Sequence, residues 1–393
     1  MKLVVAVAVL LAAVAALAFR GLGGVAPRPG EPAPAAGTVR GPDRATLDAA
    51  IARGVDHLVA TQNPGGSWGA PASNLWDIYA PVPGSYYAFE VAATALAVSG
   101  LREAAPDDPK ARAAGDRGLD FLLREHTKAR RISPDVLYNV WAHAYALDAF
   151  ACELARAPEP ARAAALRKAA AEAVDFLVRF EFVDGGWGYY NFDITARRPE
   201  HGSTSFTTAT VLQAMKRAAD QGVEIPTRVV RRALEFLAVS RKPDGSFAYS
   251  WDHRYYPQGG INKTQGSLAR TPVSLGAIRR WGGDVPERQL VKALDDLHEK
   301  GRFLLIARKY PIPHETWFQN SGYFCFYGYY YASRLFDLVP APVARDHARK
   351  IAAALVPLQE PDGSWWDYQL YSYHRPYGTG YVLRVLAACR AYR

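Results

Sequence analysis

Apolar residues along the chain recur in two alternating kinds of segment, which predicts a helical repeat. In the first kind they fall at steps of three and four, as in Val230, Ala233 and Leu237, which is typical of an amphipathic helix. The second kind is apolar nearly all round and is typical of a helix buried on several sides. The amphipathic segments are 47–60, 114–125, 169–180, 228–239, 287–298 and 344–358. The apolar segments are 89–101, 134–155, 205–219, 267–281, 323–336 and 379–392.

A glycine-rich turn followed by an aromatic residue comes after the amphipathic segments. Four copies read LVATQNPGGSW, LVRFEFVDGGW, LAVSRKPDGSF and LVPLQEPDGSW, and they end at Trp68, Trp187, Phe247 and Trp365. In each copy the first Leu and the aromatic residue are ten positions apart, and degenerate copies (LDFLLREH, LDDLHEKG) fill the two long gaps, so six copies recur every 60 residues or so. Glycine allows the tight reversal with positive φ. We expect the four aromatic side chains to pack between neighbouring repeats as structural wedges.

Six helical hairpins cannot bury their apolar faces singly, so they must stack on one another. An open superhelix needs polar caps at both ends. The last helical segment, GTGYVLRVLAACRAY, is not polar. We therefore predict an all-α fold, an (α/α)6 toroid over residues 44–393, with the amphipathic helices outside and the apolar helices lining the inside.

The N-terminal residues follow a different pattern. After Met1-Lys2, an apolar run of 17 residues extends to Phe19 and ends in small residues around Ala18. This pattern predicts a signal peptide over residues 1–20. The alternative is an uncleaved anchor, because the run is at the short end of a membrane span. Residues 21–43 are rich in Pro, Gly and Ala and predict a linker. Either interpretation places the rest of the chain outside the cytoplasm, as a periplasmic, secreted or membrane-tethered protein.

Composition excludes several classes of protein. Among 393 residues, 49% are hydrophobic and 22% charged, which excludes a disordered chain and a polytopic membrane protein. Three Cys residues exclude a disulfide scaffold. The net charge of +9 comes mainly from Arg on the expected outer helices, which is typical of a solvated surface, with an anionic envelope membrane as the alternative partner. We expect no nucleic-acid partner, because no basic stripe or known binding motif is present.

Aromatic residues gather between each turn and the apolar segment that follows it. Since every repeat runs in the same direction, these stretches should meet at one end of the ring. An apolar concavity with few polar groups is the usual form of a small-molecule site. The alternative is that these residues merely fill the crowded end of the barrel. The candidate ligand-binding residues are Tyr138, Trp141, Tyr190, Tyr323, Tyr327 and Tyr377.

Polar residues on the apolar segments supply further candidates. Asp135, Asn139 and His143 are at positions i, i+4 and i+8 and so share one helix face. We predict His143 as a general acid–base group, with Asp135 and Asn139 beside it; the alternative is a hydrogen-bonded core histidine. Arg270 would be costly to bury without an anion, which makes it a candidate for binding a phosphate or carboxylate of the ligand.

The turn motif also carries a family resemblance. QEPDGSW (359–365) is nearly the repeat motif of the prenyltransferase and squalene-cyclase superfamily, and TQNPGGSW and RKPDGSF resemble it more weakly. The resemblance covers the chain from about Ala45 to its end and implies the toroid and an isoprenoid or other apolar ligand. It is specific for the fold and not for the reaction. The Asp-x-Asp-Asp motif of class II terpene cyclases is absent, as is room for a second barrel, so a standard class II cyclase is not expected.

Protein prenyltransferases of this superfamily hold zinc with an Asp-x-Cys pair and a His of the next repeat. Cys325 and His374 resemble two of these ligands, but Tyr323 stands in place of the Asp. Catalytic zinc usually keeps three protein ligands. We therefore expect no cofactor, with a weak zinc site at Cys325 and His374 as the alternative, and we expect no protein prenyltransferase activity.

The chain is thus interpreted as an exported repeat protein that binds or processes an isoprenoid or other apolar ligand. One alternative is a non-catalytic scaffold for protein binding; the GCGEQ thioester motif is absent, which excludes covalent capture. Another is a carbohydrate-active enzyme with an (α/α)6 ring, which needs paired carboxylates in the cleft. Its candidates would be Asp135, Asp193, Asp252 and Glu315.

Overall fold

The protein is described by a computed structural model over residues 40–71, 83–129, 138–188 and 202–392. Residues 40–393 form one compact unit. Its described part is helical, with three isolated β-bridges and no strand. The expected signal segment and most of the linker lie outside the described residues. Among the residues that are described, none of the helices is long and apolar enough to cross a membrane.

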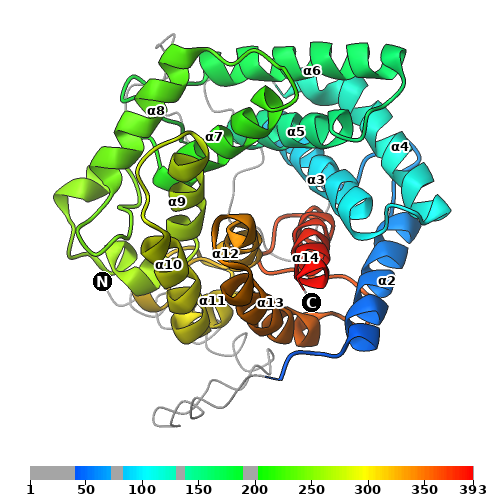
Figure 1. The fold of residues 1–393 in the computed structure, drawn as a ribbon. Coiled ribbons are helices and arrows are strands. Elements are labelled where there is room, and N and C mark those ends of the chain that lie inside the picture. The colour runs from blue at the N-terminus through cyan, green and yellow to red at the C-terminus, as the bar shows by residue number, and fades with distance from the viewer. Residues whose placement is uncertain (1–39, 72–82, 130–137, 189–201, 393) are drawn as a thin grey trace, which may run out of the picture. The chain divides into compact units, whose positions relative to one another are not determined.

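Six outer helices surround six inner helices (Figure 1). The outer helices are α2 (Arg44–Ala60), α4 (Pro109–Glu125), α6 (Pro160–Arg179), α8 (Thr227–Ser240), α10 (Glu287–Lys300) and α13 (Ala341–Leu355). The inner helices are α3 (Pro83–Ala104), α5 (Asn139–Leu154), α7 (Ser205–Ala219), α9 (Arg270–Arg280), α12 (Phe324–Ser333) and α14 (His374–Ala391). A short α11 (Arg302–Ala307) follows α10. Short 3-10 helices cover His126–Lys128, Asp252–Tyr255, Gly260–Asn262, Thr264–Gly266, Trp317–Gln319, Phe336–Leu338 and Val356–Leu358.

The inner helices close into a ring. Along the chain each packs against the next, from α3 through α5, α7, α9 and α12 to α14, and α14 packs against α3. This order leaves no open end (Figure 1). The (α/α)6 toroid predicted from the alternating segments is thereby confirmed.

The ten-residue spacing between Leu and Trp has a direct structural cause. The indole Nε1 of Trp68, Trp187 and Trp365 donates to the carbonyl oxygen ten residues earlier, at 2.7, 2.7 and 2.9 Å. All three indoles are completely buried. Trp68 packs on Gly118 of the next outer helix, where a Cβ would lie 2.7 Å from its ring. Trp365 packs on Gly54 of α2 in the same way, so Trp68 joins the first repeat to the second and Trp365 joins the sixth to the first, as predicted.

The turn glutamine shows where the ring closes. Gln62 of the first repeat donates Nε2 to the Ala114 carbonyl of α4 at 2.9 Å. Gln359 of the sixth repeat makes the same 2.9 Å contact with Ala50 of α2. The first repeat thus takes the place that a seventh would occupy. Gly363, in the turn itself, has φ +85 and sits against the backbone of α2, so a side chain there would be strained.

Most predicted helix boundaries lie within three residues of the structure, but α3, α4, α6 and α14 begin five to nine residues earlier than predicted. The helix α13 ends at Leu355, three residues before the predicted end, because Pro357 cannot continue the helix and a 3-10 turn over Val356–Leu358 follows. The helix α9 begins at Arg270, three residues later than expected, because the preceding residues form 3-10 turns.

Candidate functional site

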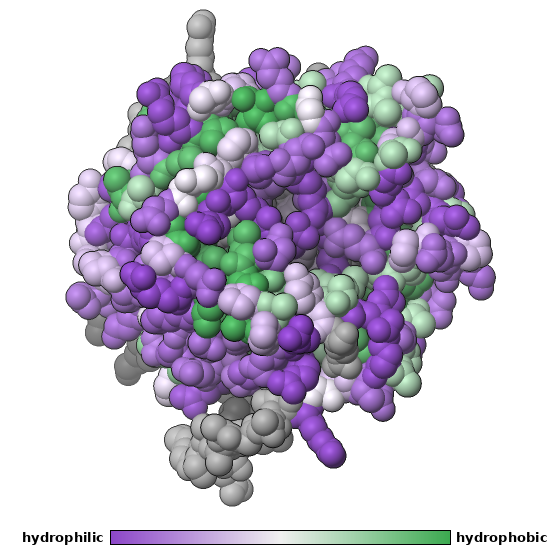
Figure 2. Space-filling view, viewed as in Figure 1, coloured by the Kyte–Doolittle hydropathy of each residue, from purple (hydrophilic) through white to green (hydrophobic). Residues whose placement is uncertain are grey.

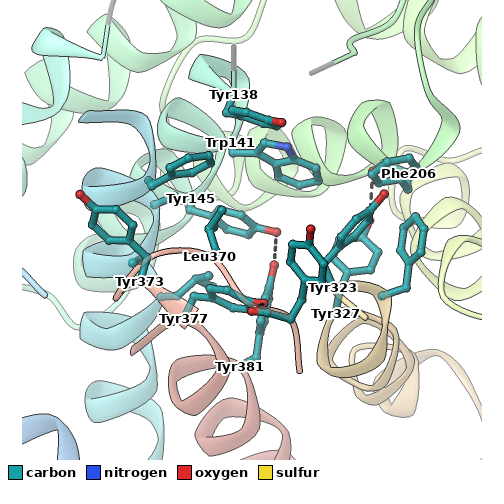
Figure 3. A pocket seen from close by; sticks show the side chains of 16 residues that line it. Tyr138, Trp141, Tyr145, Phe206, Tyr323, Tyr327, Leu370, Tyr373, Tyr377 and Tyr381 are labelled. Atoms are coloured by element: carbon teal, nitrogen blue, oxygen red, sulfur yellow. Dashed lines mark hydrogen bonds between the residues drawn. The ribbon is translucent and has the colours of Figure 1, made fainter. Parts of the chain in front are cut away.

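All six inner helices begin at the same end of the ring, and a cavity opens there. Its empty space, including the opening, is about 860 Å³, within the range of roughly 300–1,000 Å³ that small-molecule sites have. Twelve of the sixteen lining side chains are aromatic (Figure 3). The lining residues are Phe89, Ala92, Ala93, Leu96, Tyr138, Trp141, Tyr145, Phe206, Tyr323, Phe324, Tyr327, Tyr368, Leu370, Tyr373, Tyr377 and Tyr381.

Five of the six predicted aromatic ligand-binding residues meet in this cavity. Tyr138 and Trp141 come from the start of α5, and Tyr323 and Tyr327 from the start of α12. Tyr377 comes from the first turn of α14. The sixth, Tyr190, lies outside the described residues.

Three tyrosine hydroxyls of the cavity lining are hydrogen-bonded within the protein. The hydroxyls of Tyr145 and Tyr381 are hydrogen-bonded across the ring (Figure 3). The hydroxyl of Tyr327 lies 2.9 Å from Oγ1 of Thr210 and donates to the carbonyl of Phe206 at 3.1 Å. Burial raises the pKa of Tyr145, Tyr327 and Tyr381 well above the ordinary value. These phenols therefore stay neutral.

A buried carboxyl group stands behind one of the lining phenols. Tyr377 donates its hydroxyl to Oδ1 of Asp367 at 2.6 Å. The other oxygen, Oδ2, accepts the backbone N–H of Phe326 at 2.8 Å. Asp367 is fully buried, and burial raises its pKa to about 6, although the hydrogen bonds from Tyr377 and Phe326 lower it. At neutral pH most Asp367 carboxylates are thus ionised and polarise the phenol that faces the cavity.

A histidine stands behind a second lining phenol. The Nδ1 atom of His314 lies 2.9 Å from the carbonyl of Gln319, so it carries the proton. Nε2 then accepts the hydroxyl of Tyr323 at 3.0 Å. Burial lowers the pKa of His314, which keeps the ring neutral at pH 7. Tyr323 thereby has a base to which its proton can move.

Two residues at the cavity hold left-handed backbone conformations without being glycine. Tyr138 has φ 70 and caps α5, and His314 has φ 64. In the same loop as His314, Phe318 and Gln319 have φ 57 and 55. Such conformations cost about 1–3 kcal/mol each and persist where surrounding structure enforces them, often at functional sites. They bring Tyr138 and the His314–Tyr323 pair to the cavity.

The arrangement suits an apolar ligand on which positive charge develops. Aromatic faces attract a cation, and do so more strongly when water is excluded. The Asp367 carboxylate adds negative charge behind Tyr377, while His314 can take a proton from Tyr323. In the described residues no carboxylate lines the cavity directly.

The predicted acid–base group His143 lies away from the cavity. Its Nε2 is 2.7 Å from the Ala129 carbonyl, and its ring stacks on Phe176 of α6, with centroids 4.3 Å apart. Burial lowers its pKa to about 3. Asn139 is buried and is not a lining residue either, and Asp135 lies outside the described residues. The geometry gives His143 the alternative role, that of a hydrogen-bonded core histidine between α5 and α6.

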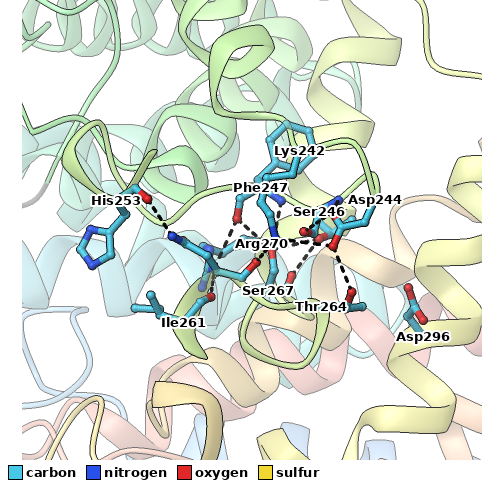
Figure 4. Close-up of polar contacts among 12 residues, drawn as sticks. Lys242, Asp244, Ser246, Phe247, His253, Ile261, Thr264, Ser267, Arg270 and Asp296 are labelled. Atoms are coloured by element: carbon cyan, nitrogen blue, oxygen red, sulfur yellow. Dashed lines mark hydrogen bonds and ion pairs between the residues drawn. The ribbon is translucent and has the colours of Figure 1, made fainter. Parts of the chain in front are cut away.

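Arg270 is buried, and backbone carbonyl oxygens surround its guanidinium. Its guanidinium donates to the carbonyls of Gly266 at 2.7 Å and Ile261 at 2.5 Å (Figure 4). Phe247 supplies a third carbonyl at 3.4 Å. These carbonyl hydrogen bonds offset the desolvation of the buried guanidinium, for which an anionic ligand had been predicted. Arg270 therefore stabilises the loop over residues 260–266 and does not line the cavity.

Cys325 and His374 do not assemble a zinc ligand set. Cys325 is fully buried, and burial raises the pKa of its thiol well above the ordinary value. Nδ1 of His374 is 2.6 Å from the Tyr371 carbonyl, and its ring packs on Trp366. Among the described residues, no group of three His, Cys, Asp or Glu side chains is placed to hold a metal ion. Cys325 and His374 therefore do not fit a zinc site.

Neither Asp367 nor His314 was predicted from the sequence as a residue of the site. Asp367 is two residues after Trp365, the wedge of the sixth repeat. This position, at the start of an aromatic-rich stretch, is the feature of the sequence that could have indicated Asp367 as a residue of the site. Its partner Phe326 is 41 residues away.

Known proteins support the family and the fold. The model of the squalene-hopene cyclase C-terminal domain matches residues 35–265. The type II terpene cyclase MstE from Scytonema is similar in structure, with TM-score 0.52 and 15% identity over 90% of this chain and 100% of that one. Cellobiose 2-epimerase from Spirochaeta thermophila has a TM-score of 0.55 and 16% sequence identity, and the match covers 89% of this chain and 98% of that one. The alpha-1,6-mannanase from Salegentibacter has a TM-score of 0.53 and 8% sequence identity, and the match covers 88% of this chain and 100% of that one. No curated protein sequence matches the chain.

Proposed function

Because the chain belongs to the family of the squalene-hopene cyclase C-terminal domain, we propose that it binds an isoprenoid or similarly apolar ligand in the aromatic cavity. The observation that carries this proposal is the lining itself, in which twelve of sixteen side chains are aromatic and the remainder are Ala or Leu. Such a surface favours hydrocarbon chains and stabilises positive charge on them.

The proposed chemistry centres on Tyr377 and Tyr323. Tyr377, polarised by the Asp367 carboxylate, would face positive charge on the ligand. Tyr323 would take up or return a proton through His314. The Asp-x-Asp-Asp acid motif is absent, so protonation of an alkene by that motif is not part of the proposal.

Ligand binding is tested with farnesol and longer polyprenyl alcohols by titration calorimetry. Ala92→Phe places a ring in the cavity and removes no side-chain hydrogen bond, whereas Ala238→Phe adds the same ring on the exposed face of α8. We expect Ala92→Phe to weaken binding at least about tenfold, since it displaces ligand from apolar contact. Ala238→Phe should bind as the wild type does. Equal binding by the two variants would refute the cavity as the site.

Export and contact with a membrane are further parts of the proposal. A signal segment over residues 1–20 would place the toroid outside the cytoplasm, and N-terminal sequencing of the secreted protein tests this. Exposed aromatic side chains at Tyr255, Tyr256 and Trp317 (70, 71 and 68% exposed) offer a contact for an envelope membrane, from which an apolar ligand could enter. Vesicle flotation of wild type against Trp317→Ala measures that contact.

A carbohydrate substrate is the second candidate, because the epimerase and the mannanase share the toroid. Of its candidate carboxylates, Asp252 and Glu315 are exposed, and Asp135 and Asp193 lie outside the described residues. Organic extraction and mass spectrometry of the native protein separate the candidates. A stoichiometric terpenoid would support the first, while an empty protein that binds oligosaccharides, or only a protein partner, would replace it.

A further inference from the structure

A second cavity opens at the opposite end of the ring, where the inner helices end. It encloses about 1300 Å³ including its opening. In the space-filling view, hydrophilic side chains surround the hollow in the middle of the ring (Figure 2). Tyr145 lines both cavities, so the hydrogen-bonded pair of Tyr145 and Tyr381 lies between them. The two ends of the lumen therefore differ sharply in chemistry: one is aromatic and the other is charged.

Four charged side chains form an ion-pair cluster at the wall of this second cavity. Glu103, Asp148 and Arg217 line the cavity, and the buried Arg384, which does not line it, pairs with them. Arg384 of α14 binds Glu103 of α3 through two nitrogens, at 2.8 and 3.1 Å. It also binds Asp148 of α5 at 2.7 Å. Arg217 of α7 lies 3.3 Å from the same Glu103 and 3.4 Å from Asp148. Two cations thus meet two carboxylates, and the cluster is neutral.

The other charged side chains at this cavity are mostly paired as well. Arg102 binds Glu153 at 3.0 Å. Arg280 binds Asp337 at 2.6 Å. Lys216 pairs with Asp220 on its own helix, and Arg156 lies 4.0 Å from Glu153. Arg334 also lines the cavity, and it belongs to none of these ion pairs.

Arg334 is the cation that stands out. It caps α12, it is only partly exposed, and within the described residues its side chain has no ion pair or hydrogen bond. Its positive charge lowers the pKa of Glu103, so the guanidinium lies close to the buried cluster. Next to it, Nε of Arg280 is buried and also lacks a hydrogen-bond partner in the described structure. Arg334 therefore presents unused guanidinium donors to this polar cavity.

We propose that this charged cavity is a binding site for a phosphate-type oxyanion, with Arg334 as its main ligand. A guanidinium offers two parallel N–H donors that match a phosphate, and a buried Arg–phosphate pair is among the stronger hydrogen-bonded contacts. The ion pairs of Arg384 and Arg217 hold the wall in place, and the positive charge of Arg334, which no carboxylate balances, attracts the anion. The proposal does not depend on ligand binding in the aromatic cavity, which lies beyond the Tyr145–Tyr381 pair.

The test is titration calorimetry of the full chain with inorganic pyrophosphate at constant ionic strength, since bulk salt screens exposed charges. Arg334→Gln removes the free charge without breaking an ion pair, and Arg345→Gln does the same on the exposed face of α13. We expect Arg334→Gln to weaken binding about tenfold or more, Arg334→Lys to weaken it less, and Arg345→Gln to leave it unchanged. Without ligand, thermal unfolding of all variants should show one cooperative transition, so that weaker binding does not reflect loss of the fold.

Two results would overturn the site: no binding of pyrophosphate by the wild type, or equal weakening by Arg334→Gln and Arg345→Gln. Titration with a prenyl diphosphate shows whether the bound phosphate group is a free anion or the head group of a larger ligand. If it binds as pyrophosphate does, the site takes a free anion. If it binds more tightly and this gain is lost in Ala92→Phe, the anion is the head group of a ligand whose chain reaches the aromatic cavity.

Discussion

Replacing Asp367 by Asn should make the protein more stable at neutral pH and leave its stability at acidic pH unchanged. Asn has nearly the same shape and never ionises. Its Oδ1 can accept the Phe326 N–H, and its Nδ2 can donate to the Tyr377 hydroxyl. That hydroxyl then donates to the Tyr368 carbonyl, which already lies 3.1 Å away. The substitution therefore removes a buried charge without removing a hydrogen bond.

The size of the effect follows from the pKa of Asp367. Burial raises it from 3.8 to about 6, which corresponds to about 3 kcal/mol at about 1.36 kcal/mol per pKa unit. The native state binds this proton more tightly than the unfolded chain does. The resulting stabilisation is complete below pH 3.8 and is lost as the pH rises from 3.8 to about 6. Above that range the variant should exceed the wild type by up to about 3 kcal/mol.

Urea unfolding from about pH 4 to about pH 8, followed by tryptophan fluorescence, measures the difference. Asp252→Asn, at an exposed carboxylate, controls for the loss of one negative charge. Tyr377→Phe removes a hydrogen bond that lowers the pKa of Asp367, so this pKa should be higher in the variant. The pH-dependent loss of stability of Tyr377→Phe should therefore extend to higher pH than that of the wild type. A difference between Asp367→Asn and wild type that stays constant with pH would refute the reasoning, as would a less stable variant at pH 8.

Three other predictions concern the framework. Trp187→Ala should lower the free energy of unfolding by about 3–5 kcal/mol in urea, because it removes a fully buried ring and leaves a cavity. Glu103→Ala should cost about 3–5 kcal/mol because it leaves Arg384 buried with half its countercharge, whereas Glu235→Ala, at an exposed pair, should cost less than about 1 kcal/mol. The pKa of His143 is lowered to about 3, so the wild type should lose about 2 kcal/mol at pH 5 through this residue as the pH falls below 6.5, and His143→Gln should not show that loss.

The repeat and the ring could be predicted because they depend on local spacing. A Leu ten residues before a Trp is both a visible pattern and a hydrogen bond within one turn, from Trp365 Nε1 to the Leu355 carbonyl. Alternation of amphipathic and apolar helices reflects which faces are buried. The gathering of Tyr138, Trp141 and Tyr327 at one end followed from the common direction of the repeats.

The roles predicted for His143 and Arg270 required their side chains to point into the lumen. Hydrophobic periodicity does not show which face of an inner helix points there. His143 is on an apolar helix that is buried on all sides, and its imidazole points outward to Phe176 rather than into the lumen. The Arg270 guanidinium meets three backbone carbonyl oxygens, two from the loop over residues 260–266 and a third from Phe247, and no helix periodicity shows these contacts.

The amino-acid sequence by itself determined the toroid, its six repeats and the aromatic end of the lumen, because each of these arises from residues close together in the chain. Only the tertiary structure decided the chemistry of the two cavities. Asp367 acquires its raised pKa from burial beneath Tyr377 and α12, and Arg384 meets Glu103 across 281 residues of sequence. Burial and long-range pairing set the charge of a group, and both exist only after the ring has closed.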